Sequence, residues 1–149
     1  MADSIYPDID VPELQTASPA PTDLGRELKF DFGAGEFVGG GSPQVVEGIA
    51  ALKVWIEKAL RTARYRYLAY TPNYGSELEA FIEKQPPLTQ ALLEVEVERL
   101  IREAIGYDNR IKELRNFQIV RGSDWLDIEF EVVTILGEVA PMGVRWIDV

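Results

Sequence analysis

The chain of 149 residues contains no cysteine and no histidine. The lack of cysteine excludes disulfides, zinc–thiolate sites and thiol nucleophiles. The additional lack of histidine excludes Ser-His and Cys-His catalysis, and leaves mainly carboxylates as metal ligands, which suit calcium or magnesium rather than transition metals. We therefore expect no metal site, no cofactor and no catalytic residues.

Long apolar runs are missing as well. No stretch reaches the roughly 20 apolar residues of a membrane span, and Met1–Asp3 does not begin a signal peptide. We expect a soluble protein without a membrane partner, which stays in the compartment where it is made. The length is that of one domain with its own core.

Basic residues are scarce, with 15 lysines and arginines against 25 acidic residues and a formal net charge of -10. Phosphate binding rests on counterion release by a net basic surface, so we expect no nucleic-acid partner. One segment departs from this balance. Residues 53–66 carry five basic side chains and a single acid, together with Trp55 and Tyr65. This composition indicates an anion-binding or protein-contact surface.

The first 26 residues predict a separate acidic arm. They hold five acids, four prolines and one arginine, and their apolar residues follow no period. Such a stretch buries too little surface to offset the entropy of ordering it. We expect residues 1–26 to be extended or disordered, either as a solvating tail or as an arm that orders along a neighbouring subunit. Residues 27–149 are expected to form one domain.

The next residues predict a strand, a joint and a helix. Residues 28–38 alternate apolar and polar side chains and then reach two glycines, which is typical of a short strand and a hairpin turn. Glycines 39–41 form a flexible joint, because the Lys-Ser/Thr pair of a phosphate-binding loop is absent. Apolar residues at spacings of three and four from Val45 to Leu60 predict a helix with Ser42 as its N-cap.

A link and a short helix are expected next. Residues 64–70 read Arg-Tyr-Arg-Tyr-Leu-Ala-Tyr, and their alternation predicts a short strand or an extended link. Residues 71–75 carry turn chemistry, since Pro fixes one φ angle while Asn and Gly tolerate positive φ. Ser76 and Glu79 predict a capping box at the start of the helix.

The last third predicts a helix followed by strands. Residues 88–105 show an apolar face opposite a charged, solvated face, and Gly106 is expected to end the helix. From residue 110 the period is two, and residues 126–132 alternate apolar side chains with acids, as in an antiparallel strand with one wet face. The predicted apolar face of the helix consists of Leu88, Leu92, Leu93, Val95, Val97, Leu100, Ile101, Ala104 and Ile105.

These elements predict an α+β fold, in which helices pack on a small antiparallel or mixed sheet formed largely by the C-terminal third. Strands at 111–120 and near the C-terminus would flank the central strand. The last residues, 144–149, are expected either to offer a free edge to a partner or to complete the sheet of this domain.

Two short motifs carry a resemblance to a known family. They are Leu60-Arg61-Thr62 with the link Arg64-Tyr65-Arg66, and Pro72-Asn73-Tyr74-Gly75-Ser76 before a short amphipathic helix. In this order they resemble the sheath-initiator family of contractile phage tails, also known as lysozyme-like baseplate wedge proteins, and most of all its XkdS-like branch. The resemblance covers about residue 31 to the C-terminus. Many relatives have an acidic residue in the arginine motif. This chain has Arg64-Tyr65-Arg66 there, so the acid is missing, and Arg66 corresponds to the motif arginine.

The resemblance implies a structural baseplate component of a contractile phage tail or tail-like particle, assembled in the bacterial cytoplasm. Several copies around the tail axis would contact other baseplate wedge proteins and the tail sheath protein, with tail tube and hub proteins as further candidates. The chain would start sheath assembly by offering a sheet edge to the first sheath ring. The candidate partner-binding residues are Arg61, Arg64, Arg66, Tyr74, Gly75, Val144, Trp146 and Val149.

Two other classes stay open. Because relatives are often labelled lysozyme-like, a glycoside hydrolase is one alternative, and it would need two carboxylates across a cleft. Glu77 and Glu79 are the nearest candidates, but they would lie on different faces of one helix and Glu79 has a capping role. We therefore expect no enzyme. A generic protein-interaction domain is the other alternative.

Overall fold

The computed structural model of the protein describes residues 23–84 and 87–147. Most of the predicted arm and Val149 therefore lie outside the described residues. Leu24, which the prediction assigned to the arm, is only 1% exposed and belongs to the core. The packed part of the chain thus begins before the predicted limit at residue 26.

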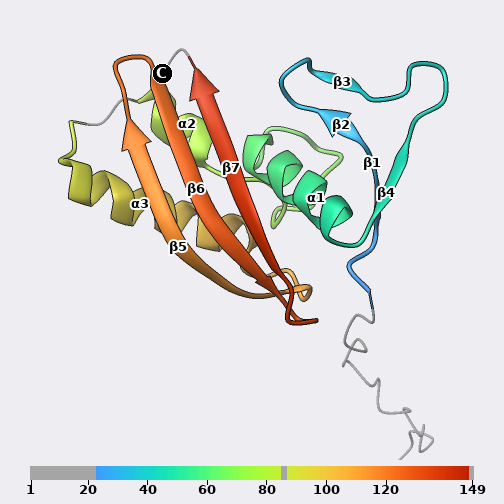
Figure 1. Cartoon of the computed structure of the whole chain (residues 1–149). Helices are drawn as coiled ribbons and strands as arrows, with labels where there is room; N and C mark the ends of the chain where they lie inside the picture. Colours follow the sequence, from blue (N-terminus) through green and yellow to red (C-terminus); the bar gives the residue numbers. More distant parts are fainter. Residues whose placement is uncertain (1–22, 85–86, 148–149) are drawn as a thin grey trace, which may run out of the picture.

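A sheet of three long strands occupies the C-terminal third. Strands β5 (Ile111–Arg121), β6 (Trp125–Thr134) and β7 (Val139–Ile147) form an antiparallel meander in the order β5-β6-β7 (Figure 1). Every second residue of β6 is buried because one face of the sheet is covered and the other is open. The predicted α+β class and the C-terminal meander are confirmed.

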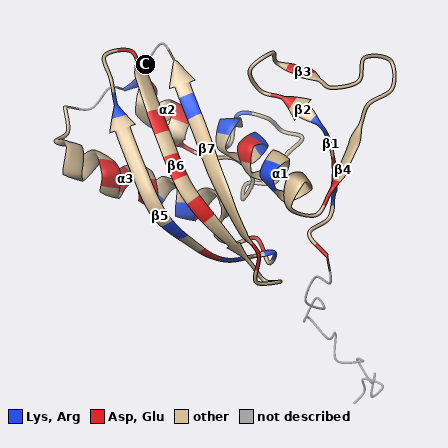
Figure 2. Ribbon diagram, in the orientation of Figure 1, with Lys and Arg blue, Asp and Glu red and all other residues tan. Residues whose placement is uncertain are grey.

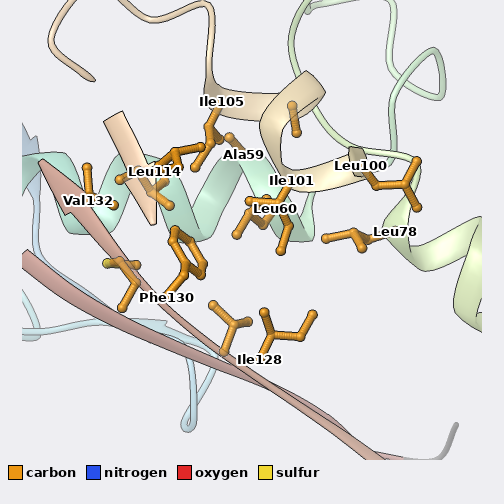
Figure 3. Close-up of a cluster of buried hydrophobic side chains, with 14 of the residues drawn as sticks. Ala59, Leu60, Leu78, Leu100, Ile101, Ile105, Leu114, Ile128, Phe130 and Val132 are labelled. Atoms are coloured by element: carbon orange, nitrogen blue, oxygen red, sulfur yellow. The ribbon is translucent and has the colours of Figure 1, made fainter. Parts of the chain in front are cut away.

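The helices lie on one side of this sheet. Helix α3 (Gln90–Ile105) crosses behind β5 and β6, whereas α1 (Ile49–Arg61) and the short α2 (Leu78–Glu83) lie nearer to β7 (Figure 1). Their apolar side chains meet those of the sheet, and Figure 3 shows Leu60 from α1, Ile101 from α3 and Phe130 from β6 in this core. Burial of this apolar surface is the main force that holds helices and sheet together.

The predicted helix near residues 88–105 is confirmed as α3. The Thr89 hydroxyl accepts a hydrogen bond from the backbone N–H of Leu92, and Gly106 follows the last turn. The prediction was wrong for two apolar positions, because Leu92 is 55% and Val95 is 66% exposed. At 100° per residue these two positions turn away from the stripe that meets the sheet. The buried residues of α3 are Leu93, Val97, Leu100, Ile101, Ala104 and Ile105.

The predicted start of the first helix was wrong. Residues Val45–Glu47 form strand β4, which pairs antiparallel with β1 (Arg26–Leu28), and α1 begins only after Gly48. Gly48 has a positive φ of 66°, so the chain changes direction there, and the β-branched Val45 and Val46 suit the strand. Ser42 is therefore not the N-cap.

A hairpin between β1 and β4 agrees with the sequence pattern. Strands β2 (Phe30–Asp31) and β3 (Glu36–Phe37) pair antiparallel across the two glycines that interrupt the alternation. With β1 and β4 they form a ribbon that extends to the right of the main body in Figure 1.

The predicted extended link at residues 64–70 was also wrong. The chain forms turns there, Tyr65 has a positive φ of 65°, and an isolated bridge joins Ala63 to Ser76. Alternation of side chains favours a strand only where a neighbouring strand accepts its backbone hydrogen bonds, and no strand of the described chain pairs with these residues.

The predicted capping box does not form. The Ser76 hydroxyl does accept a hydrogen bond from the N–H of Leu78, at 3.3 Å. The Glu79 carboxylate, however, pairs with a side chain of the loop instead of the helix N-terminus, and Glu77 occupies the N-cap position without a side-chain bond.

Candidate partner-binding surfaces

The loop between α1 and α2 positions four of the predicted site residues, and its base is tightly closed. The N–H of Arg64 donates to the carbonyl of Ser76 at 3.0 Å, and the N–H of Ser76 donates to the carbonyl of Thr62 at 2.9 Å. The Ser76 hydroxyl, which is buried, donates to the carbonyl of Leu60 at 2.6 Å. The two ends of the loop are therefore fastened to each other and to the end of α1.

Gly75 is required by this closure. Its φ angle is +97°, and a Cβ added there would lie 2.7 Å from the carbonyl oxygen of Thr62 and 3.1 Å from the backbone of Arg64. A side chain would therefore meet backbone that has no room to move. The structure thus places this predicted site residue at the base of the loop, where it shapes the backbone.

Arg64 also serves the loop base. Its side chain is only 7% exposed, and its guanidinium donates to the carbonyl of Gly75 at 3.1 and 3.3 Å and to the Glu103 carboxylate of α3 at 2.9 Å. The acidic partner of Arg64 therefore comes from α3, 39 positions further along the chain. Arg64 contacts its own fold, and we do not assign it to a partner surface.

Arg66 points outward. Its side chain is 53% exposed and forms an ion pair with Glu79 of α2 at 3.3 Å. The negative charge of Glu79 raises the pKa of Arg66. An exposed pair of this kind contributes little to stability, so the guanidinium is free to exchange partners.

Tyr74 belongs to a row of aromatic rings that joins the loop to α1. The centroid of its ring lies 4.7 Å from that of Tyr70 and 6.3 Å from that of Trp55. Beyond these neighbours the row continues to Tyr67 at one end and Tyr107 at the other. Burial raises the pKa of Tyr74 to about 12. The ring therefore acts as a packing element between the tip of the loop and the core.

Arg61, at the end of α1, links α1 to β7. Its guanidinium lies 5.6 Å from the ring of Phe32 and 5.7 Å from the ring of Trp146, and it pairs with Glu57 at 3.0 Å. It also donates to the backbone carbonyl of Arg145 at 3.4 Å. Trp146, another predicted site residue, is thus partly covered by Arg61, whereas Val144 is buried in the core at 3% exposure.

Strand β7 is an edge of the sheet. It pairs with β6 without interruption from Trp125↔Ile147 to Val133↔Val139, and no described strand pairs with its other side. The opposite edge, β5, has register shifts between 111 and 113 and between 115 and 118. Residues 144–147 therefore complete the sheet of this domain and at the same time leave a regular edge free. Sequence alone does not show which side of a strand is left without a neighbour.

The open face of the sheet is acidic along its centre. Asp127, Glu129 and Glu131 stand at alternate positions of β6, and Figure 2 shows acidic segments along β6 with basic segments on β5 and β7. Arg145 of β7 pairs with Asp127, and Arg115 of β5 pairs with Glu131 at 3.0 Å. This alternation of charge is a pattern that an incoming polar surface would have to match.

The residues considered for hydrolysis do not form a paired acid site. Glu79 is occupied by Arg66, and Glu77 stands at the N-cap of α2. Within residues 23–84 and 87–147 no cluster of three acidic or other metal-ligating side chains is found. Nor does any helix in this part of the chain have the length and apolar character to cross a membrane.

Comparison with known proteins agrees with the resemblance. The model of the family described as contractile injection system sheath initiator matches residues 26–137, a range that includes the α1–α2 loop, α3, β5 and β6. The phage-like element PBSX protein XkdS of Bacillus subtilis (strain 168) is 28% identical over 131 residues, which cover 88% of this chain and 89% of the relative. The chain therefore belongs to the contractile injection system sheath initiators, structural proteins of phage tails and related particles.

Proposed function

We propose that this protein sits in the baseplate of a contractile phage tail or tail-like particle and starts the sheath by pairing the free edge of β7 with a strand of the sheath protein. The observation that carries the proposal is the continuous pairing of β7 on one side only. A free edge offers unpaired N–H and C=O groups, which an extended segment of a partner satisfies by adding a strand.

The direction of the backbone groups supports this use of β7. In an antiparallel strand the N–H and C=O of one residue point to the same side, and successive residues alternate. The carbonyl of Arg145 accepts from Arg61 rather than from β6, so the polar groups of Arg145, Gly143 and Pro141 face outward. Proline lacks an N–H and is tolerated in a sheet at such outward positions. An incoming strand would thus form hydrogen bonds with the outward groups of Gly143 and Arg145. To reach the carbonyl of Arg145 it has to displace the Arg61 side chain.

The remaining assignments follow from the family. The chain would be present in several copies around the tail axis, assembled in the bacterial cytoplasm, with other baseplate wedge proteins as neighbours and tube or hub proteins as further candidates. Of the predicted contacts, Arg66 is the exposed one on the α1–α2 loop, while Arg61 and Trp146 border the β7 edge. We assign the protein no catalytic role, since Glu79 is ion-paired with Arg66 and Glu77 lies only two residues before it, at the N-cap position of the same helix.

A single-residue substitution tests the edge. Gly143→Pro removes one outward N–H from β7, and a Cβ added at this position meets nothing within 4 Å. We expect the variant to fold and to enter tail particles that lack sheath. Gly143→Ala, which keeps the N–H, is the matched control and should yield sheathed tails. Electron microscopy counts sheathed and bare tails, and thermal unfolding checks that both variants fold.

Normal sheath on Gly143→Pro particles would exclude β7 as the docking edge. Ile147→Pro has the same outward orientation and provides a second, independent variant near the end of the strand.

A further inference from the structure

We propose that the tip of the α1–α2 loop, residues 65–70, anchors this protein in the particle by inserting Leu68 into an apolar pocket edged by carboxylates on a partner other than the sheath protein. This inference rests on the proposed function only in that the chain is part of a tail particle. It concerns a surface that the strand-docking edge does not use.

The tip exposes large side chains that contribute little to this fold. Leu68 is fully exposed, at 106%, and Tyr65, Tyr67 and Tyr70 are exposed at 72, 52 and 50%. Four such side chains are thus exposed within six residues of the chain. Surfaces of this kind on soluble proteins mark sites of protein contact, because leaving them in water is unfavourable.

The tip is held in shape before any partner binds. Tyr70 donates its N–H to the carbonyl of Tyr67 at 3.3 Å, and the rings of these residues lie 6.2 Å apart, edge to face. The ring of Tyr70 in turn contacts Tyr74, which leads into the core. At the base of the loop, the ion pair of Arg64 with Glu103 fastens the loop to α3. A surface that is already ordered loses little conformational entropy on binding, which favours affinity.

The backbone of the tip is also unusual. Tyr65 has a φ of 65°, a backbone conformation that residues other than glycine rarely adopt. Strained backbone persists where the surrounding contacts enforce it, and such positions cluster at functional sites. Here the strain accompanies the turn that carries the tip away from the base of the loop.

Charge indicates the chemistry of the partner. Residues 64–75 contain two arginines and no acid, in a chain whose formal net charge is -10. The side chain of Arg64 is only 7% exposed and lies at the loop base, whereas that of Arg66, within the tip, is 53% exposed. Tyrosine and arginine are enriched among residues that dominate binding energy, and their hydroxyl and guanidinium groups pair with carboxylates. The complementary surface is therefore an apolar pocket for Leu68 with acids at its edge.

The first test compares two exposed leucines on different surfaces. Leu68→Asp changes the tip, while Leu92→Asp changes the exposed side of α3, where Leu92 is 55% exposed. Neither variant loses a core contact, so both should melt within a few degrees of the unchanged protein. We expect Leu68→Asp to be at least tenfold depleted from purified particles and Leu92→Asp to be incorporated normally. Incorporation of Leu68→Asp at the normal level would overturn the proposal.

A second test uses the absence of cysteine from the chain. In Leu68→Cys the new thiol is the only one in the protein, and a maleimide reagent reports its exposure. The thiol should react freely in the isolated protein and at least tenfold more slowly in assembled particles. Equal rates in the two states would show that nothing covers the tip.

The stage at which particle assembly fails in the Leu68→Asp variant identifies the partner. Loss of the chain from particles supports docking to a component other than sheath, whereas particles that contain Leu68→Asp but lack sheath would assign the tip to the sheath protein and overturn the proposal. Analytical ultracentrifugation of the free protein tests a second copy as the occupant: self-association abolished by Leu68→Asp would also overturn it. The Gly143→Pro variant, which should remain in particles, keeps the two proposals separable.

Discussion

At the scale of single residues, the basic segment of the sequence is not one surface. Arg61, Arg64 and Arg66 each pair with an acid of the same chain, at 3.0, 2.9 and 3.3 Å, and Lys58 pairs with Glu27 at 2.9 Å. The acids come from different elements, so the basic side chains point in different directions. Of the three arginines predicted to bind partners, Arg64 is the one with its side chain buried.

Replacement of Arg64 should therefore weaken the fold. Arg64→Ala leaves the carbonyl of Gly75 without its guanidinium donor and removes the ion pair to Glu103. We expect a loss of about 2 kcal/mol in the free energy of unfolding, measured by urea denaturation. Arg64→Lys should restore only part of it, because an ammonium group cannot make the same forked contacts.

The matched control is Arg66→Ala, which removes an exposed ion pair and should change stability by less than about 1 kcal/mol. If Arg64→Ala is as stable as the unchanged protein but fails to assemble, Arg64 contacts a partner after all.

At the scale of elements, α3 shows how far periodicity can predict burial. The pattern identified the helix and most of its buried side. It assigned nine apolar residues to the buried face, whereas six residues of α3 are buried. A helix that meets a sheet on one side buries a limited arc, and apolar residues at its margins stay in water. Leu92 and Leu93 are neighbours in sequence, but Leu93 is 2% exposed while Leu92 is 55% exposed.

This pair yields a direct comparison within one helix. Leu93→Ala should lower the free energy of unfolding by about 2–4 kcal/mol, because it leaves a cavity in the core. Leu92→Ala should change it by no more than about 0.5 kcal/mol, as is usual for exposed positions. Equal effects in urea denaturation would mean that α3 is rotated from the orientation described here.

At the scale of the whole molecule, the pH range of stability follows from a few shifted groups. Burial raises the pKa of Tyr74 from 10.0 to about 12. The fold therefore favours the neutral phenol, and this contribution is complete below pH 10 and is lost as pH rises from 10 to 12. The full shift corresponds to roughly 2.7 kcal/mol, and because the side chain is partly exposed we expect about 1 kcal/mol.

Urea denaturation at pH 8 and pH 11 measures this loss of stability, and Tyr74→Phe should lose less stability between the two pH values. A Tyr74→Phe variant that loses as much stability at pH 11 as the unchanged protein would assign the alkaline loss to other groups.

On the acid side, the hydrogen bonds from Arg145 lower the pKa of Asp127. The stability that Asp127 contributes is present above the usual pKa of aspartate and is lost as pH falls through the lowered pKa.

The local pattern of side chains was enough to predict the meander, the helix α3 and the β2–β3 hairpin. These elements depend on periodicity, turn residues and caps within a few positions of one another. The family was indicated by the short motifs Leu60-Arg61-Thr62, Arg64-Tyr65-Arg66 and Pro72-Asn73-Tyr74-Gly75-Ser76, in this order. Of these residues, Gly75 has a steric reason to be glycine, since a Cβ there would meet the backbone of Thr62 and Arg64.

Only the tertiary structure decided what the site residues do. Glu103 reaches Arg64 across 39 positions of sequence, and Arg61 meets Phe32 and Trp146 from elements far apart in the chain. The same is true of the free edge of β7 and the full exposure of Leu68, since both depend on which neighbours are absent. Sequence spacing encodes the direction of a side chain within its own element, but burial and pairing arise only when separate elements pack together.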